Sequence, residues 1–145
     1  APTMSIAENL ALAARRGRSR GLRSALGAGW MHALHERVRV LHMGLEHRLE
    51  NAIGTLSGGE RQALTLLMAT WLSPEIFLLD EHTAALDPKS GDKVIRVSED
   101  IIARDKLTAL MVTHSMSQAA TLGDRLIMMH RGRIIYDVRG AEKRR

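Results

Sequence analysis

The sequence predicts an α/β fold in which helices cover a mostly parallel sheet. Two short apolar runs, residues 75–79 and 107–113, have the length and composition of strands buried on both faces of such a sheet. Between them, Asp87 is a good N-cap and Pro88 a good first residue for a helix that extends to about residue 104. The alternation of apolar strand and helix is the basis of the predicted fold class.

The first part of the chain is predicted to be helical. Ser5 and Glu8 have capping-box spacing for a helix over residues 5–14, and an apolar stripe predicts a second helix over residues 29–44. Arginines crowd the connection at residues 15–23, which we interpret as a solvated loop. Contact of this loop with lipid headgroups or with acidic loops of a membrane partner is the alternative.

The end of the chain predicts a short helix and a hairpin. The helix covers residues 115–122 and ends near Gly123. Residues 126–129 and 133–138 are then two strands joined by a tight turn. The last residues, 140–145, form a charged tail that we expect to fray.

Composition excludes several classes of protein. The chain has 145 residues, 45% of them hydrophobic, and no cysteine, which rules out a disulfide framework and a cysteine metal site. No apolar run reaches the length of a membrane-spanning helix. The net charge of +5 permits an anionic partner such as nucleic acid, but aromatic residues make up only 3%, which argues against a stacking platform for single strands.

A glycine pair opens a third predicted helix, over residues 58–72. Ser57 and Glu60 have the capping-box spacing, and Gly58 and Gly59 fall in the first turn. Each glycine costs about 1 kcal/mol against alanine, so we expect that a helix built only for packing would not need them. They leave backbone N–H groups open at the positive end of the helix dipole, which suits phosphate. A plain capped helix is the alternative.

Two carboxylates end the first apolar strand. Asp80 and Glu81 stand where open α/β sheets place their ligands, so that Asp80 could hold Mg²⁺ and Glu81 could polarise a water molecule. His114 follows the next strand and lies at the same sheet edge if the two strands are parallel. The alternative is a strand end that simply turns into solvent.

The order of these features resembles the ATP-binding subunit of ABC transporters. Residues 56–62 (LSGGERQ) are similar to its signature motif, residues 76–81 to its Walker B motif, residues 84–87 to its D-loop, and His114 to its switch histidine. The resemblance implies a P-loop NTPase-like ABC ATPase core with a helical subdomain. Residues 1–72 would be the helical subdomain and residues 73–145 the C-terminal half of the catalytic core.

The resemblance also implies a role for each motif residue in a head-to-tail dimer that sandwiches ATP. Ser57, Gly58 and Gly59 would contact the γ-phosphate of ATP held by the opposite subunit. Asp80 would bind Mg²⁺ through water, Glu81 would act as base or orient water, and His114 would contact the γ-phosphate. Gln62 and Asp87 would lie at the dimer interface.

The chain lacks the Walker A loop, the Q-loop and the adenine-stacking aromatic of this family. No G-x-x-x-x-G-K-S/T loop occurs, and this Walker A loop is what cradles the phosphates. We therefore expect a partial chain that is inactive by itself, with the Q-loop glutamine upstream of Ala1. His82 stands where the family usually has proline, and Ala84 where serine is common; we expect both to tune the site.

The implied function is ATP hydrolysis that powers solute transport, with an amino-acid-type substrate suggested by DEHTAALDPK and the MMHRGRI hairpin. The implied partners are a second ATPase subunit, transmembrane permease subunits and a substrate-binding protein, at the cytoplasmic face of the membrane. The alternative is a soluble ABC-type ATPase that acts on nucleic acid. The basic charge favours that alternative, and the short helical subdomain disfavours it, so we expect no nucleic-acid partner.

Overall fold

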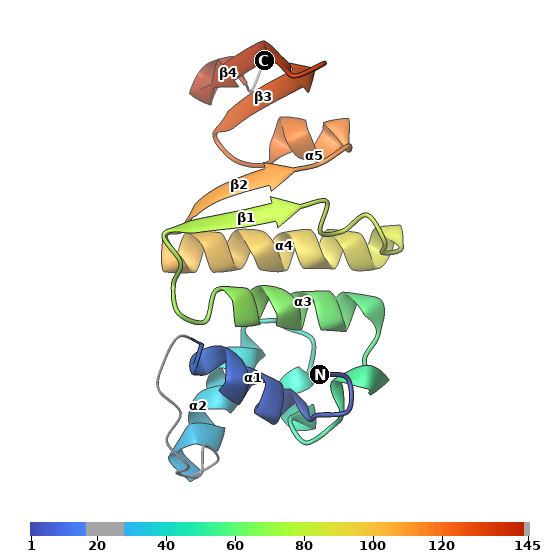
Figure 1. Ribbon diagram of the computed structural model, residues 1–145, viewed down its shortest axis with the longest axis vertical. Helices are drawn as coiled ribbons and strands as arrows, with labels where there is room; N and C mark the ends of the chain where they lie inside the picture. Colours follow the sequence, from blue (N-terminus) through green and yellow to red (C-terminus); the bar gives the residue numbers. More distant parts are fainter. Residues whose placement is uncertain (17–27, 144–145) are drawn as a thin grey trace. The chain divides into compact units, whose positions relative to one another are not determined.

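The structure is a computed structural model that describes residues 1–16 and 28–143 (Figure 1). Most of the arginine-rich connection, and the end of the charged tail, lie outside the described residues. The chain forms two compact units. The first comprises Ala1–Leu78 with His82–Leu110, and the second Leu79–Glu81 with Met111–Arg145. The division at residues 72 and 73 into two subdomains stays a prediction.

Four helices and two 3-10 turns make up most of the first unit, and they are α1 (Ile6–Ala14), α2 (Ala28–Arg39), η1 (Leu45–Arg48), η2 (Ile53–Thr55), α3 (Gly58–Ala69) and α4 (Pro88–Asp105). Side chains that pack between them are fully buried, among them Ile6, Leu10, Leu34, Leu64 and Ile101. Figure 1 shows α3 running alongside α4. No helix in the described part of the chain is long and apolar enough to cross a membrane.

The predicted helix starts are confirmed. Ser5 and Ser57 each form a complete capping box with the glutamate three residues later. Asp87 caps α4 by accepting a hydrogen bond from the Ser90 N–H at 3.0 Å, and Pro88 is the first helical residue. These ends were readable because a cap depends on residues close together in sequence.

Two predicted helix ends were wrong. The second helix ends at Arg39 and not at residue 44, since His42 and Gly44 take the left-handed backbone conformation, with φ of 51° and 68°. The third ends at Ala69 and not at residue 72, because Thr70 takes the C-cap position there. The second helix is followed by a local backbone reversal, which apolar periodicity does not reveal.

The strands β1 (Ile76–Asp80) and β2 (Thr108–Val112) pair with each other, and Figure 1 draws them pointing the same way. The apolar composition predicts strands that need cover on both faces, but within the described chain β1 is covered on one face only. Phe77 and Leu79 are buried, but Ile76 and Leu78 are 60% and 67% exposed, and β2 is largely exposed as well. In the part of the chain that the structure describes, nothing covers the second face of β1.

The predicted hairpin is confirmed. Strands β3 (Arg125–His130) and β4 (Arg133–Arg139) are antiparallel, and His130 pairs with Arg133 across the turn. Arg131 and Gly132 both have positive φ, 46° and 75°, as a two-residue type I′ turn requires. The short helix α5 (Met116–Thr121) precedes the hairpin, and η3 (Gly140–Glu142) follows it.

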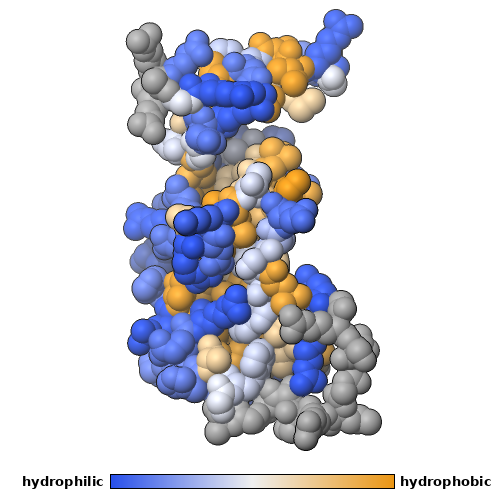
Figure 2. All heavy atoms as spheres, turned by 90° about the vertical axis from the view of Figure 1, so that its left-hand side faces the viewer, coloured by the Kyte–Doolittle hydropathy of each residue, from blue (hydrophilic) through white to orange (hydrophobic). Residues whose placement is uncertain are grey.

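Several apolar side chains remain exposed on the second unit. They include Met116 on α5, Met129 on β3 and Ile134, Ile135 and Tyr136 on β4. Figure 2 shows apolar surface between polar areas on the face that it presents. Exposed apolar groups in such number are typical of surface that another polypeptide covers.

The C-terminus of α4 allows a test of backbone strain. Lys106 has a left-handed backbone conformation, φ 50°, which costs a residue with a side chain about 1 kcal/mol. We expect Lys106→Gly to raise the free energy of unfolding by about 0.5–1 kcal/mol, measured by chemical denaturation. Lys106→Ala keeps the strain and is the control. A Gly variant less stable than the Ala variant would contradict this account.

Candidate functional site

The N-terminus of α3 is held by a closed set of polar contacts. The Ser57 Oγ accepts from the Glu60 N–H at 3.3 Å, and Glu60 Oε2 accepts from the Ser57 N–H at 2.7 Å. The other carboxylate oxygen of Glu60 accepts from an Nη of Arg48 at 2.7 Å. The Ser57 N–H, more than any other group, lowers the pKa of Glu60, and Arg48 adds to the effect.

This arrangement leaves an anion-compatible set of donors. The N–H groups of Gly58 and Gly59 have no partner among the described residues, and the first N–H groups of a helix have none within the helix. The Ser57 hydroxyl accepts a hydrogen bond and keeps its own hydrogen to donate. Arg48 balances the negative charge of Glu60 beside these donors. The residues therefore fit a phosphate oxygen.

Packing leaves little room for a side chain at either glycine. A Cβ on Gly58 would lie 3.2 Å from Cδ2 of Leu86, and a Cβ on Gly59 would lie 3.2 Å from Cβ of Ser90. The two glycines therefore also have a packing context that the sequence did not reveal, since α3 lies close to α4 and to the turn before it. The contact brings the signature-like residues beside the D-loop-like residues within one unit.

Two further predicted residues lie on either side of this contact. Gln62 is half-buried on α3, one turn after the glycines. Asp87 is exposed at the start of α4, where its carboxylate caps the helix, and the hydrogen bonds from Ser90 lower its pKa. The Asp87 carboxylate thus serves as a helix cap. The Gln62 side chain has no hydrogen bond among the described residues.

The second cluster of predicted residues lies in the other unit. Nε2 of His114 is 2.6 Å from Oε1 of Glu81, and the Glu81 N–H donates to the Val112 carbonyl oxygen at 3.0 Å. His114 and Glu81 therefore meet at the ends of adjacent strands. Both side chains are solvent-exposed, so the pair contributes little to stability.

Glu81 also has a left-handed backbone, with φ of 43°. Non-glycine residues adopt this conformation at a cost, and they do so mainly at turns and functional sites. The hydrogen bond to Val112 holds the residue there.

The carboxylates of Asp80 and Glu81 are hard oxygen ligands of the kind that Mg²⁺ prefers. The described residues contain no group of three or more His, Cys, Asp or Glu side chains that could hold a metal ion. Mg²⁺ is commonly bound by one or two carboxylates together with substrate phosphates, so a single exposed carboxylate fits that mode. Asp80, the exposed last residue of β1, is such a group.

Sequence reasoning missed what His82 does. Its Nε2 lies 3.0 Å from Oγ of Ser98, and Ser98 is completely buried on α4. Burial lowers the pKa of His82, so the ring is neutral at physiological pH. The sequence did show a histidine where the family usually has proline. Its hydrogen-bond partner, Ser98, could not be identified from the sequence because it lies sixteen residues further along the chain.

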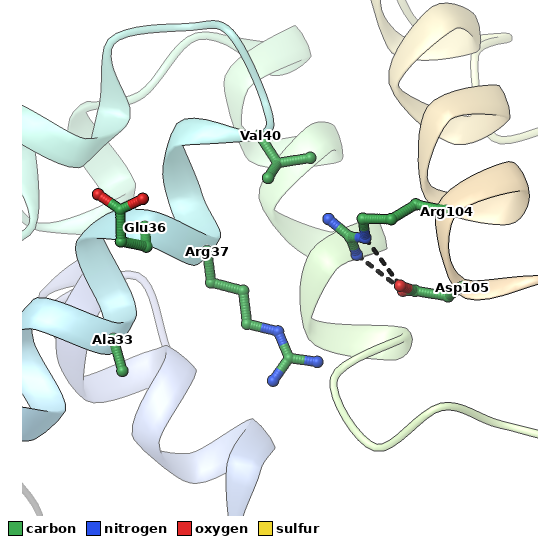
Figure 3. A pocket seen from close by; sticks show the side chains of 6 residues that line it. All are labelled: Ala33, Glu36, Arg37, Val40, Arg104 and Asp105. Carbon is green, nitrogen blue, oxygen red and sulfur yellow. Dashed lines mark hydrogen bonds and ion pairs between the residues drawn. The ribbon is translucent and has the colours of Figure 1, made fainter.

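A recess of about 360 Å³ opens between α2 and the end of α4, lined by Ala33, Glu36, Arg37, Val40, Arg104 and Asp105 (Figure 3). Arg37 donates to the Trp71 carbonyl oxygen at 2.9 Å, and its guanidinium lies 4.2 Å from the centre of the Trp71 ring. Arg104 and Asp105 form a two-bond ion pair with each other. Burial, followed by the charge of Arg104, lowers the pKa of Arg37.

The two glycines are expected to differ in their tolerance of a side chain. At Gly59 the added Cβ meets Ser90 Cβ, which is fixed to the α4 backbone, whereas at Gly58 it meets the end of the flexible Leu86 side chain. We expect Gly59→Ala to be less stable than Gly58→Ala by about 1–2 kcal/mol in chemical denaturation. Equal stability of the two variants would mean that Ser90 gives way freely.

His82 predicts a component of acid sensitivity. Because its pKa is lower in the folded chain than in the unfolded one, its contribution is fully present above the unfolded value of about 6.5 and is lost as pH falls below it. We expect the melting temperature to fall from pH 7.5 to pH 5, and to fall less in His82→Gln. His130→Gln, at an exposed hairpin position, is the control and should keep the wild-type pH profile.

Comparisons with known proteins identify the family of this chain. The ABC transporter family matches residues 1–84. The "Tyrosine transport ATP-binding protein" of Clostridioides difficile (strain R20291) is 41% identical over 98% of this chain and 56% of that protein. The "Phosphate import ATP-binding protein PstB 1" of Vibrio cholerae is 42% identical over 68% of this chain and 36% of that protein.

Solved structures show the same fold. The ADP conformation of MJ1267, an ATP-binding cassette of an ABC transporter, superposes with a TM-score of 0.77 at 22% identity, covering 98% of this chain and 57% of that one. A nucleotide-free ATP-binding cassette gives a TM-score of 0.73 at 23% identity, covering 98% and 58%. The chain thus spans little more than half the length of these cassettes, with the α/β fold predicted from its sequence. This chain belongs to the ABC transporter family.

Proposed function

We propose that this chain is the signature-bearing part of an ABC-type ATPase subunit that works as a head-to-tail dimer. The proposal rests on the N-terminus of α3. There Arg48 pairs with Glu60 of the capping box, and the N–H groups of Gly58 and Gly59 have no partner among the described residues. A helix end of this kind binds anions through its dipole and its free donors. The anion that fits the family is the γ-phosphate of ATP held by the opposite subunit.

The chain's own residues then divide the work of phosphoryl transfer, which needs positioning and charge stabilisation more than covalent chemistry. Ser57, Gly58 and Gly59 orient the γ-phosphate. Asp80 would hold Mg²⁺, which would supply positive charge against the phosphates. Glu81 orients the attacking water or accepts its proton, and His114, which contacts Glu81, contacts the γ-phosphate. Gln62 and Asp87 contact the second subunit.

The Walker A loop must come from outside this chain, because its 145 residues contain no Gly-Lys pair. The exposed second face of β1 supports the proposal that a further part of the ATPase core covers it. We propose that the chain is joined to such a part in the working subunit. By itself the chain lacks the loop that binds the phosphates, and we expect it to be inactive.

The proposed process is solute uptake, with an amino-acid-type substrate. Its support is the tyrosine transport protein that matches 98% of this chain. The proposed partners are a second ATPase subunit, permease subunits and a substrate-binding protein, with the chain at the cytoplasmic face of the membrane. Relatives are named for phosphate and phosphonate import as well, and these names favour transport over the nucleic-acid alternative.

Glu81 provides the test of the catalytic assignment. We expect Glu81→Gln in the full-length protein to lower kcat for ATP hydrolysis by about 100-fold or more, because the amide cannot accept a proton. The dissociation constant for ATP, measured by calorimetry, should remain within about threefold of wild type, since the Glu81 carboxylate is not assigned a contact with the phosphates. Glu75→Gln, at the other end of the strand, is the control. Near-normal turnover in Glu81→Gln would exclude this carboxylate.

The Arg37 recess is the proposed contact for a permease subunit. Glu36 pairs with Arg39 at 3.1 Å and Asp105 pairs with Arg104, so no described carboxylate forms an ion pair with Arg37. Residues 17–27 contain arginines and no acidic residue that could do so. Ala33 and Val40 give the recess apolar walls. A glutamate or aspartate side chain from a partner matches this charge and lining.

We expect Arg37→Glu to lower co-purification of the full-length protein with its permease subunits by about tenfold, because the new carboxylate repels the partner's acid. Arg39→Glu on the same helix, whose arginine is already paired and exposed, is the matched control. Unchanged co-purification in Arg37→Glu would place the permease contact elsewhere.

A further inference from the structure

The turn between β1 and α4 has little backbone bonding of its own. Within residues 82–86 of the described chain, the Leu86 N–H donates to the Thr83 carbonyl oxygen at 3.1 Å, and no other backbone bond closes the turn. Leu86 packs against Gly58 at one end of the turn. A segment without a hydrogen-bond ladder depends on such side-chain contacts for a single conformation.

His82 supplies the contact at the other end. Its Nε2 lies 3.0 Å from Ser98 Oγ, and the Ser98 hydroxyl donates its hydrogen to the Val94 carbonyl oxygen at 2.8 Å. Because a hydroxyl has one hydrogen, Ser98 can only accept from His82. The hydrogen of the neutral imidazole is therefore on Nε2, and the chain of donors runs from His82 through Ser98 to the α4 backbone.

We propose that His82 is a positioning residue that fixes the turn of residues 83–86 against α4, and through it the D-loop-like residues of the ATPase site. The inference rests on the proposed function, in which those residues face the second subunit. His82 acts through the turn and contacts no nucleotide. Where the family usually has a proline, which stiffens the backbone through its ring, this chain uses a hydrogen bond to a buried hydroxyl.

The burial of Ser98 distinguishes an anchor from a chance contact. Its side chain is completely buried, where a hydroxyl costs free energy unless its hydrogen-bonding capacity is used. Val94 uses its hydrogen and His82 uses its oxygen. Loss of either side chain therefore releases the same end of the turn, and the two losses should not add.

The test compares variants of the full-length protein in steady-state ATP hydrolysis. Glutamine places a donor where Nε2 stands, and asparagine is one bond too short to reach Ser98. We expect His82→Asn, His82→Ala and Ser98→Ala each to lower kcat about fivefold, the factor that corresponds to one lost hydrogen bond, with KM for ATP within about twofold of wild type. His82→Gln should stay within about twofold of wild type in both constants.

The double variant His82→Ala/Ser98→Ala should lose no more than either single variant, and His130→Ala should match wild type. The inference would be overturned by a wild-type kcat in His82→Asn, by losses that multiply in the double variant, or by an effect confined to KM. His82→Asn keeps a polar side chain at this position, so it guards against a loss that reflects misfolding of the alanine variants.

Amide hydrogen exchange separates this inference from the proposed function. Peptides that cover residues 83–86 should exchange about fivefold faster in His82→Asn than in His82→Gln, while peptides from α1 exchange alike. This measurement needs no turnover. If the wild type does not hydrolyse ATP, the proposed function is refuted. The exchange rates then still test whether His82 positions the turn. Equal rates in the two variants would overturn it.

Discussion

The structure depends on the close approach of α3 to the start of α4. Gly58 and Gly59 allow it, since a Cβ on either would lie 3.2 Å from a side-chain atom of the facing segment. The same glycines expose N–H groups at the helix end. One sequence feature therefore allows the close packing and leaves the helix end open. This explains why the first turn tolerates residues that weaken a helix.

Charged groups in this chain are arranged according to their exposure. Glu60 is half-buried and has two partners, Ser57 and Arg48, which use both of its oxygens. Glu81 and His114 are exposed and contact each other, so both side chains remain accessible to other groups. The paired, half-buried Glu60 thus supports the end of α3, while the exposed pair adds little to stability.

Backbone strain, exposed apolar surface and a cation without a carboxylate partner occur at three places among the described residues. Glu81 keeps a left-handed backbone that its hydrogen bond to Val112 maintains. Ile76 and Leu78 expose apolar surface that a strand in a parallel sheet normally buries. The Arg37 guanidinium is stacked on Trp71 and lacks a carboxylate within the described residues. Glu81 and Arg37 are compensated by contacts within the chain, whereas the exposed face of β1 is not covered by any described residue.

The sequence by itself determined whatever depends on neighbours along the chain. The capping boxes at Ser5 and Ser57, the Asp87 cap and the Arg131-Gly132 turn were readable because their partners lie within a few residues. The order of motifs was enough to identify the family. Tertiary structure alone decided which face of β1 is buried, that the two glycines lie at a close packing contact, and that His82 bonds to Ser98. Those features depend on surfaces brought together from distant positions, and hydrophobic periodicity carries no information about which surface meets which.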